Sequence, residues 1–230
     1  VIPYSSFKSI PVNEDTLKRY FQDEIDKLED FLYELKSAAR SLATPGVIKD
    51  IERAKKTFEA KLERLADHKK DNAKTIIWEE LGIDMLIVDE FHSFKNLFFP
   101  TKMSRIAGLG NSDSQRAFDM FIKSRWVLDK GGKFVGLTGT PVTNTLAELF
   151  TMQRYFQMAV LEDLGLTHFD AWANQFALAE PGLEMTPDGA GFRMNVRFRK
   201  FVNVPELMRI WYQVCDTKKI DKDSGIERPE

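Results

Sequence analysis

The chain is organised around Met85-Leu86-Ile87-Val88-Asp89-Glu90-Phe91-His92, in which an apolar run ends in two carboxylates and a histidine follows. Such a run predicts a strand buried on both faces, although periodicity alone does not exclude a buried helix. In open α/β sheets, ligands bind just beyond the carboxyl ends of the strands. Asp89 and Glu90 are therefore expected at a rim that can hold a metal–phosphate group; the alternative is a strand end with two solvated acids.

The composition describes a chain that can bury a core. With 230 residues, 43% of them hydrophobic and 12% aromatic, it forms one large domain or two small ones. The net charge of −2 excludes an overall basic field, so contact with nucleic acid must come from a local patch. The single cysteine, Cys215, excludes an intramolecular disulfide and fits a reducing compartment, which predicts a cytoplasmic location.

Neither a membrane span nor a signal peptide is visible in the sequence. No apolar stretch reaches the ~20 residues of a membrane helix, so no membrane partner is expected. The chain opens with Val1-Ile2-Pro3-Tyr4-Ser5-Ser6-Phe7, which predicts a short strand and a Ser-Ser turn, and it has no initiator methionine. Together with the charged tail at residues 218–225, this opening predicts a piece of a longer protein.

Two amphipathic helices are predicted between residues 14 and 72. Apolar residues in the first, over 14–43, recur at alternating spacings of four and three, as in a heptad seam: Phe21, Ile25, Leu28, Leu32, Leu35, Ala39 and Leu42. The second carries a looser seam: Val47, Ile51, Ala54, Phe58, Leu62 and Leu65. Since Thr44-Pro45-Gly46 joins them, we expect an antiparallel hairpin, either a solvated arm or a docking arm for a partner.

The middle of the chain alternates strands and helices, which predicts a parallel sheet with right-handed crossovers. The expected order is a short helix at 78–81, a strand at 83–88, a polar loop at 101–111, a helix at 113–129, a strand at 133–137 and a helix at 145–158. The loop carries Lys102 and Arg105.

The pattern weakens after residue 159. Residues 180–191 have the glycine and proline content of a loop, and a final helix is expected from Val204 to about Cys215. Between them lies a basic cluster interleaved with apolar residues: Arg193, Arg197, Arg199 and Lys200. Such a cluster can follow a nucleic-acid backbone or can be a basic strand on a solvated edge, and both readings stay open.

Two motifs together resemble motifs II and III of superfamily-two helicases, most closely the Swi/Snf-like branch of DNA translocases with a DEAH-type box. These motifs are Asp89-Glu90-Phe91-His92, continued by Lys95-Asn96, and Leu137-Thr138-Gly139-Thr140-Pro141-Val142-Thr143-Asn144, continued by Glu148-Leu149-Phe150. Residues 1–7 look like the backbone-contacting motif that precedes motif II. The overall style is similar to large helicases of phages and mobile elements, some of which are fused to DNA methylases.

The resemblance implies an α/β fold: a partial RecA-like P-loop NTPase domain with a parallel sheet and an inserted antiparallel helical hairpin. Residues 1–12 and 73–160 would form the second half of the first RecA-like domain, 13–72 the inserted hairpin, and 161–230 a helical and basic extension. The implied cofactors are ATP and Mg²⁺. The implied partners are double-stranded DNA, a second RecA-like domain and a methylase domain.

The resemblance also implies roles for individual residues. Asp89 would hold Mg²⁺ through water, Glu90 would polarise the attacking water, and His92 would bond towards Thr138 or Thr140. The coupling residues of motif III would be Thr138, Gly139, Thr140, Pro141 and Asn144, and the nucleic-acid contacts Ser5, Ser6, Lys95, Lys102, Arg105, Arg197 and Arg199. Phe91 departs from the small residue usual in the box, so its ring must fit beside the nucleotide pocket or in the core.

A phosphate-binding loop of the form G-x-x-x-x-G-K-[ST] is absent from these residues, as are motifs V and VI. We therefore expect the 230 residues alone neither to bind ATP well nor to hydrolyse it. An uncovered apolar sheet is also expected, and with it self-association.

Two other classes of function compete with a helicase. One is a metal-dependent nuclease built on Asp89, Glu90 and His92, which needs further ligands; the remaining histidines, His68 and His168, lack ligand spacing. The other is a non-catalytic interaction module for nucleic acid or protein, built on the helical hairpin.

Overall fold

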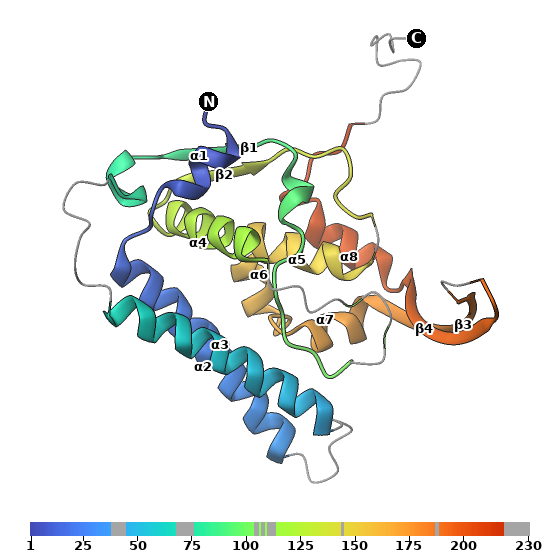
Figure 1. The fold of residues 1–230 in the computed structure, drawn as a ribbon. Coiled ribbons are helices and arrows are strands. Elements are labelled where there is room, and N and C mark those ends of the chain that lie inside the picture. The colour runs from blue at the N-terminus through green and yellow to red at the C-terminus, as the bar shows by residue number, and fades with distance from the viewer. Residues whose placement is uncertain are drawn as a thin grey trace.

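A computed structural model describes residues 1–37, 45–67, 76–103, 106, 109, 114–143, 145–186 and 189–218 (Figure 1). It contains both helices and strands, with a small parallel sheet and a separate antiparallel sheet, so the predicted α/β class is confirmed. The elements in chain order are α1 (Tyr4–Ser9), α2 (Glu14–Ser37), α3 (Pro45–Asp67), η1 (Trp78–Leu81), β1 (Met85–Val88), η2 (Phe91–Phe94), α4 (Gln115–Asp129), β2 (Lys133–Gly136), α5 (Ala147–Phe156), α6 (Met158–Asp163), α7 (Phe169–Phe176), β3 (Ala177–Met185), β4 (Phe192–Phe201) and α8 (Val204–Trp211).

Strands β1 and β2 are parallel neighbours, as the alternation of strands and helices predicted, with Val88 opposite Gly136. The prediction that β1 is buried on both faces is wrong. Val88 is 4% exposed and faces the core, whereas Met85 is 49% and Ile87 57% exposed on the other face. Strand residues alternate between faces, and the described chain covers only one side of this strand.

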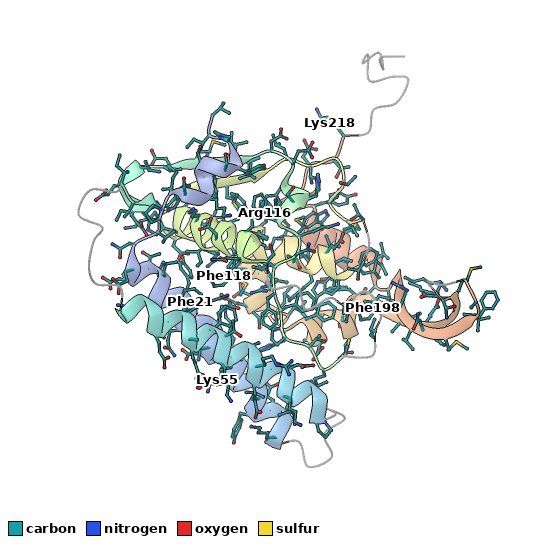
Figure 2. The ribbon with its side chains drawn as sticks, in the orientation of Figure 1. Phe21, Lys55, Arg116, Phe118, Phe198 and Lys218 are labelled. Carbon is teal, nitrogen blue, oxygen red and sulfur yellow. The ribbon has the colours of Figure 1, made fainter. Side chains whose placement is uncertain are left out.

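Helices α2 and α3 form the predicted antiparallel arm, and the arm shares the main core. Residues of the α2 seam from Phe21 to Leu35 are buried, as are Val47, Ile51 and Phe58 of α3. Ala39, Leu42 and the side chain of Leu65 lie outside the described residues. Phe21 stacks on Phe118 of α4 at 5.2 Å between ring centroids, so the arm is packed along the body (Figure 2).

A buried ion pair fastens the same arm. Glu24 on α2 lies 3.4 Å from the Arg154 guanidinium on α5, and both side chains are almost fully buried. Burial alone would raise the pKa of Glu24, but the charges of Arg154 and Lys27 outweigh it and lower that pKa. Arg154 also donates to the Phe98 carbonyl at 2.6 Å.

Residues 4–9 form helix α1, so the strand predicted for residues 1–7 is wrong. Phe7 is the buried residue of this helix and packs edge-on against Trp78 at 5.3 Å. Lys123 on α4 is fully buried beneath it: its ammonium donates to the Phe7 carbonyl at 2.9 Å and pairs with Asp119 at 2.8 Å. A single buried side chain was too weak a pattern to separate helix from strand.

The final third of the described chain has its own hydrophobic cluster, built around Phe150, Phe169, Trp172 and Leu207. The loop predicted at 180–191 is wrong over 180–185, because β3 runs through Pro181 and Gly182 and pairs antiparallel with β4. The expected helical extension thus contains a β-hairpin, which projects from the body in Figure 1.

One face of the hairpin is apolar and exposed. Leu183 stands opposite Met194 and Met185 opposite Phe192, and all four of these apolar side chains are exposed.

The helix predicted at 145–158 is divided into α5 and α6 at Gln157. Among the described residues, no helix is both long and apolar enough to cross a membrane.

Candidate functional site

The predicted motifs meet where β1 and β2 end side by side. The Leu137 N–H donates to the Val88 carbonyl at 2.8 Å, and the Phe91 N–H donates to the Leu137 carbonyl at 2.8 Å. These bonds continue the parallel ladder beyond the strands. They hold the turn that carries Asp89 and Glu90 against the turn that begins at Thr138.

Both acids lie exposed at this rim. The Glu90 backbone is left-handed, with φ 50° and ψ 44°, a conformation that a residue other than glycine adopts rarely. The Glu90 N–H donates to Asp89 Oδ1 at 2.9 Å, and the Tyr4 hydroxyl donates to the Asp89 carbonyl. The sharp turn directs the chain from β1 into η2, and Tyr4 links α1 to it.

His92 bridges the two motifs. Its Nδ1 lies 3.3 Å from Thr138 Oγ1 and 3.2 Å from Glu90 Oε2. Thr138 Oγ1 also accepts from the Thr140 N–H at 3.1 Å. Of the two expected partners, Thr138 is therefore in direct contact with the imidazole and Thr140 reaches it through Thr138.

Phe91 occupies the core rather than the rim. Its side chain is 1% exposed, and its ring lies edge-on to Tyr155 at 4.9 Å and to Phe134 at 5.4 Å. Tyr155 donates to the Ala117 carbonyl at 2.8 Å, and burial raises the pKa of its hydroxyl. Of the two places open to the Phe91 ring, the structure thus selects the core.

Lys95 faces the protein. Its ammonium lies 2.9 Å from Glu148 Oε1, where the two side chains are 14% and 6% exposed, and it also donates to the Thr143 hydroxyl. Glu148 Oε2 accepts from the Thr143 N–H at 2.6 Å. The contribution of Thr143 and Glu148 was missed in the sequence, where only the Glu-Leu-aromatic continuation of motif III indicated it.

The other expected nucleic-acid contacts are scattered. Ser5 and Ser6 are exposed on α1, and Lys102 lies over the Phe31 ring at 5.2 Å. Arg197 and Arg199 both approach Glu184 on β3, Arg199 at 3.7 Å. Gly139 and Pro141 are exposed beside Thr140, whereas Arg105 and Asn144 lie outside the described residues.

The donor set suits a cation that keeps most of its water. Among the described residues, no three His, Cys, Asp or Glu side chains are grouped to hold a metal by themselves. Mg²⁺ needs no such group, because it binds one or two carboxylates together with water and phosphate oxygens. Exposed Asp89 fits that requirement. His168 instead stacks on Phe31 at 5.6 Å and does not join a nuclease site with Asp89, and His68 lies outside the described residues.

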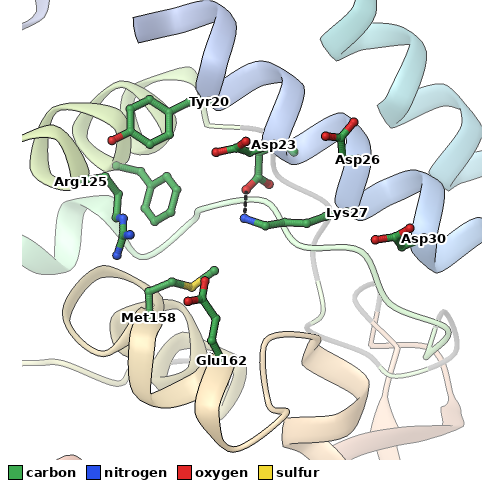
Figure 3. Close-up of a pocket in the computed structure, with 10 residues that line it drawn as sticks. Tyr20, Asp23, Asp26, Lys27, Asp30, Arg125, Met158 and Glu162 are labelled. Carbon is green, nitrogen blue, oxygen red and sulfur yellow. Dashed lines mark hydrogen bonds and ion pairs between the residues drawn. The ribbon is translucent and has the colours of Figure 1, made fainter. Parts of the chain in front are cut away.

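Several hollows lie on the described part of the molecule, and one of them reaches Asp89. A groove of about 590 Å³ runs beside β1 and α1, with residues of both faces of β1 in its lining: Ile2, Tyr4, Trp78, Met85, Val88 and Asp89 among others. A second hollow of about 340 Å³, between α2, α4 and α6, is rich in charge (Figure 3). The second hollow shares no lining residue with the Asp89–Thr138 site, and among its carboxylates Glu24 pairs with Lys27 at 3.2 Å.

The comparison with known families defines a helicase-related domain. Residues 1–219 match the family described as "Probable helicase domain", and the chain belongs to that family. The chain is also similar to the "Defense against restriction protein B" of Escherichia phage P1, with 29% identity over 159 residues. That match covers 66% of this chain but 7% of the phage protein, so the chain spans a small part of its relative. No solved structure matches.

Proposed function

We propose that this chain supplies the Mg²⁺-binding and coupling motifs of an ATP-dependent DNA helicase or translocase of the Swi/Snf-like branch. The observation that carries the proposal is the His92–Thr138 contact at 3.3 Å, made at the carboxyl ends of two adjacent parallel strands. That edge is where nucleotides bind in open α/β sheets. Membership of the helicase family supports the same class.

Each residue of the site has a chemical task in this proposal. Asp89 holds Mg²⁺ through water, and the ion neutralises charge on the β- and γ-phosphates when bound. Glu90 orients and polarises the attacking water, and it is exposed at the rim for that purpose. The His92 imidazole contacts Glu90 on one side and Thr138 on the other. A movement of Glu90 on ATP binding or hydrolysis is therefore passed to the motif III turn.

The remaining catalytic elements of the proposed helicase lie in a longer protein. The phosphate-binding loop and the arginines of a second RecA-like domain are absent from this sequence, so we assign them to that protein, with a methylase domain as a further companion. Residues 1–12 and 73–160 then belong to one RecA-like unit, with 13–72 as its inserted arm. The phage origin of the relative supports a mobile-element setting.

The test compares the 230-residue chain with a longer natural protein that contains it. We expect no ATP hydrolysis by the chain and DNA-stimulated hydrolysis by the longer protein. Glu90→Gln should abolish turnover and spare nucleotide binding, whereas Glu34→Gln, on the exposed face of α2, should change neither. DNA-stimulated hydrolysis by the 230 residues, lost in Glu90→Gln, would contradict the need for an outside phosphate loop. A longer protein without ATPase activity would contradict the proposal as a whole.

A further inference from the structure

The short helix η2 presents two side chains to motif III. In a 3₁₀-helix, residues i and i+3 lie on the same side. His92 and Lys95 have this spacing, and the Lys95 N–H donates to the His92 carbonyl at 3.3 Å, so the turn extends through Lys95. Both side chains therefore face the loop that follows β2.

That loop is attached to η2 at its two ends. We call residues 138–143 the motif III arch. Its first end meets His92 through Thr138, and its last end meets Lys95 through Thr143. Between the two attachments, Gly139, Thr140 and Pro141 are exposed. The motif III arch is thus attached at two points, both on the turn formed by η2 and Lys95.

The two attachments are unlike in strength. The His92 side chain is 34% exposed, and its single contact with Thr138 is long at 3.3 Å. At the other end, Glu148 is buried, accepts twice from Thr143 and pairs with Lys95 at 2.9 Å. Buried ion pairs are costly to break once formed, because a lone charge is left without solvent. The His92 end can therefore release while the Lys95 end stays fixed.

We propose that Lys95 is a positioning residue, which acts through Glu148 and Thr143 to anchor the motif III arch so that movement of His92 is passed to Gly139, Thr140 and Pro141. This inference rests on the proposed function and deepens it. It also gives Lys95 a task inside the protein in place of the nucleic-acid contact expected from the sequence.

The first test uses NMR on the 230-residue chain and needs no nucleotide. Lys95→Met and Glu148→Gln should shift the Gly139 and Thr140 amide resonances and the His92 imidazole resonances, each in the direction in which Thr138→Val shifts them. The Lys95 ammonium bonds to Thr143 and Glu148 and to none of these groups, and both substitutions leave the backbone bond from Lys95 to His92 in place, so a local effect would not reach them. Lys95→Arg should restore the shifts in part. Lys36→Met, which breaks an exposed pair of the same 2.9 Å length with Glu52, should leave them unchanged.

The second test uses steady-state kinetics of the longer protein. Lys95→Met should lower the DNA-stimulated kcat about tenfold or more and leave the KM for ATP unchanged, because misplacing a coupling element affects turnover more than binding. If Lys95→Met unfolds the chain, the milder Glu148→Gln carries both measurements. Unchanged Gly139, Thr140 and His92 signals in Glu148→Gln would overturn the inference, as would an unchanged kcat in an active longer protein. An inactive unsubstituted protein would count against the proposed function alone, since the NMR result stands by itself.

Discussion

The Phe91 ring lies against Gly136 so closely that a Cβ atom built on the glycine would come within 2.8 Å of the ring carbon Cγ. The bulky residue in the motif II box is thus matched by the absence of a side chain at the end of β2. The aromatic ring occupies the space next to the sheet that a Cβ would need.

Gly136→Ala should therefore destabilise the chain by about 1–3 kcal/mol through overpacking. Phe91→Ala should cost about 3–5 kcal/mol, as expected for a fully buried ring. In the double variant the alanine at 136 should cost less than it does alone, because one of its two close ring neighbours is gone and only Phe156 Cζ, at 2.8 Å, remains. Urea unfolding measures all three; Gly139→Ala, whose Cβ would meet nothing within 4 Å, is the control. Strictly additive effects would contradict the contact.

The ion pair between Glu24 and Arg154 should hold the arm on the body. Arg154→Met removes the buried partner of Glu24 and leaves this buried carboxylate with the more exposed Lys27 alone, so we expect a loss of about 3 kcal/mol in the free energy of unfolding. Arg53→Met, which breaks an exposed pair with Asp50 on α3, should cost no more than about 1 kcal/mol. Equal losses in the two variants would mean that the buried Glu24–Arg154 pair stabilises the fold no more than the exposed pair does.

The open face of β1 should make the chain self-associate. Met85 and Ile87 are exposed on a strand whose second edge is unpaired in the described chain, and such edges pair with other chains. Light scattering should show mass rising with concentration, and Ile87→Lys should reduce the rise. Tyr33→Lys, at an exposed position on α2, is the matched control. A monomer over a wide concentration range would refute this expectation.

The hairpin should loosen at acid pH. Hydrogen bonds from Arg197 and then Asn195 lower the pKa of Glu184 from 4.5 to about 2. A carboxyl whose folded pKa is depressed stabilises the fold above its unfolded pKa, and this stabilisation is lost as the pH falls from about 4.5 to about 2. Amide hydrogen exchange in β3 and β4 should rise over that interval. Glu184→Gln should remove the dependence; an unchanged profile in that variant would assign it to another group.

The basic side chains of β4 should be tested by salt dependence. Arg197 and Arg199 share the single carboxylate of Glu184, so their positive charge is only partly neutralised. If both contact phosphates, Arg197→Glu with Arg199→Glu should reduce the slope of log K against log salt for DNA binding by nearly two. An unchanged slope would favour the solvated basic strand that the sequence left open.

Periodic patterns predicted the regular parts of this chain, and pairwise contacts decided the rest. The heptad seam from Phe21 to Leu35 indicated α2 because every fourth or third position meets the same core. Strand β3 escaped prediction because Pro181 and Gly182 are typical of loops, yet a two-stranded sheet tolerates Pro on an edge. In the site, the family resemblance implied that His92 bonds towards Thr138 or Thr140, but no local pattern predicts that Lys95 turns inward to Glu148 across 53 residues of chain (148 − 95).

The rate at which Lys123 is chemically modified should report how often α1 separates from α4. Its ammonium is fully buried and bound to the Phe7 carbonyl, so an amine-directed reagent reaches it only when α1 lifts away from α4. Acylation of Lys123 should thus be far slower than that of exposed Lys36, and its rate should measure how often α1 opens. Tyr4 on the same helix bonds to the Asp89 carbonyl. The acylation rate of Lys123 therefore measures how often the helix beside Asp89 and Glu90 detaches from the body.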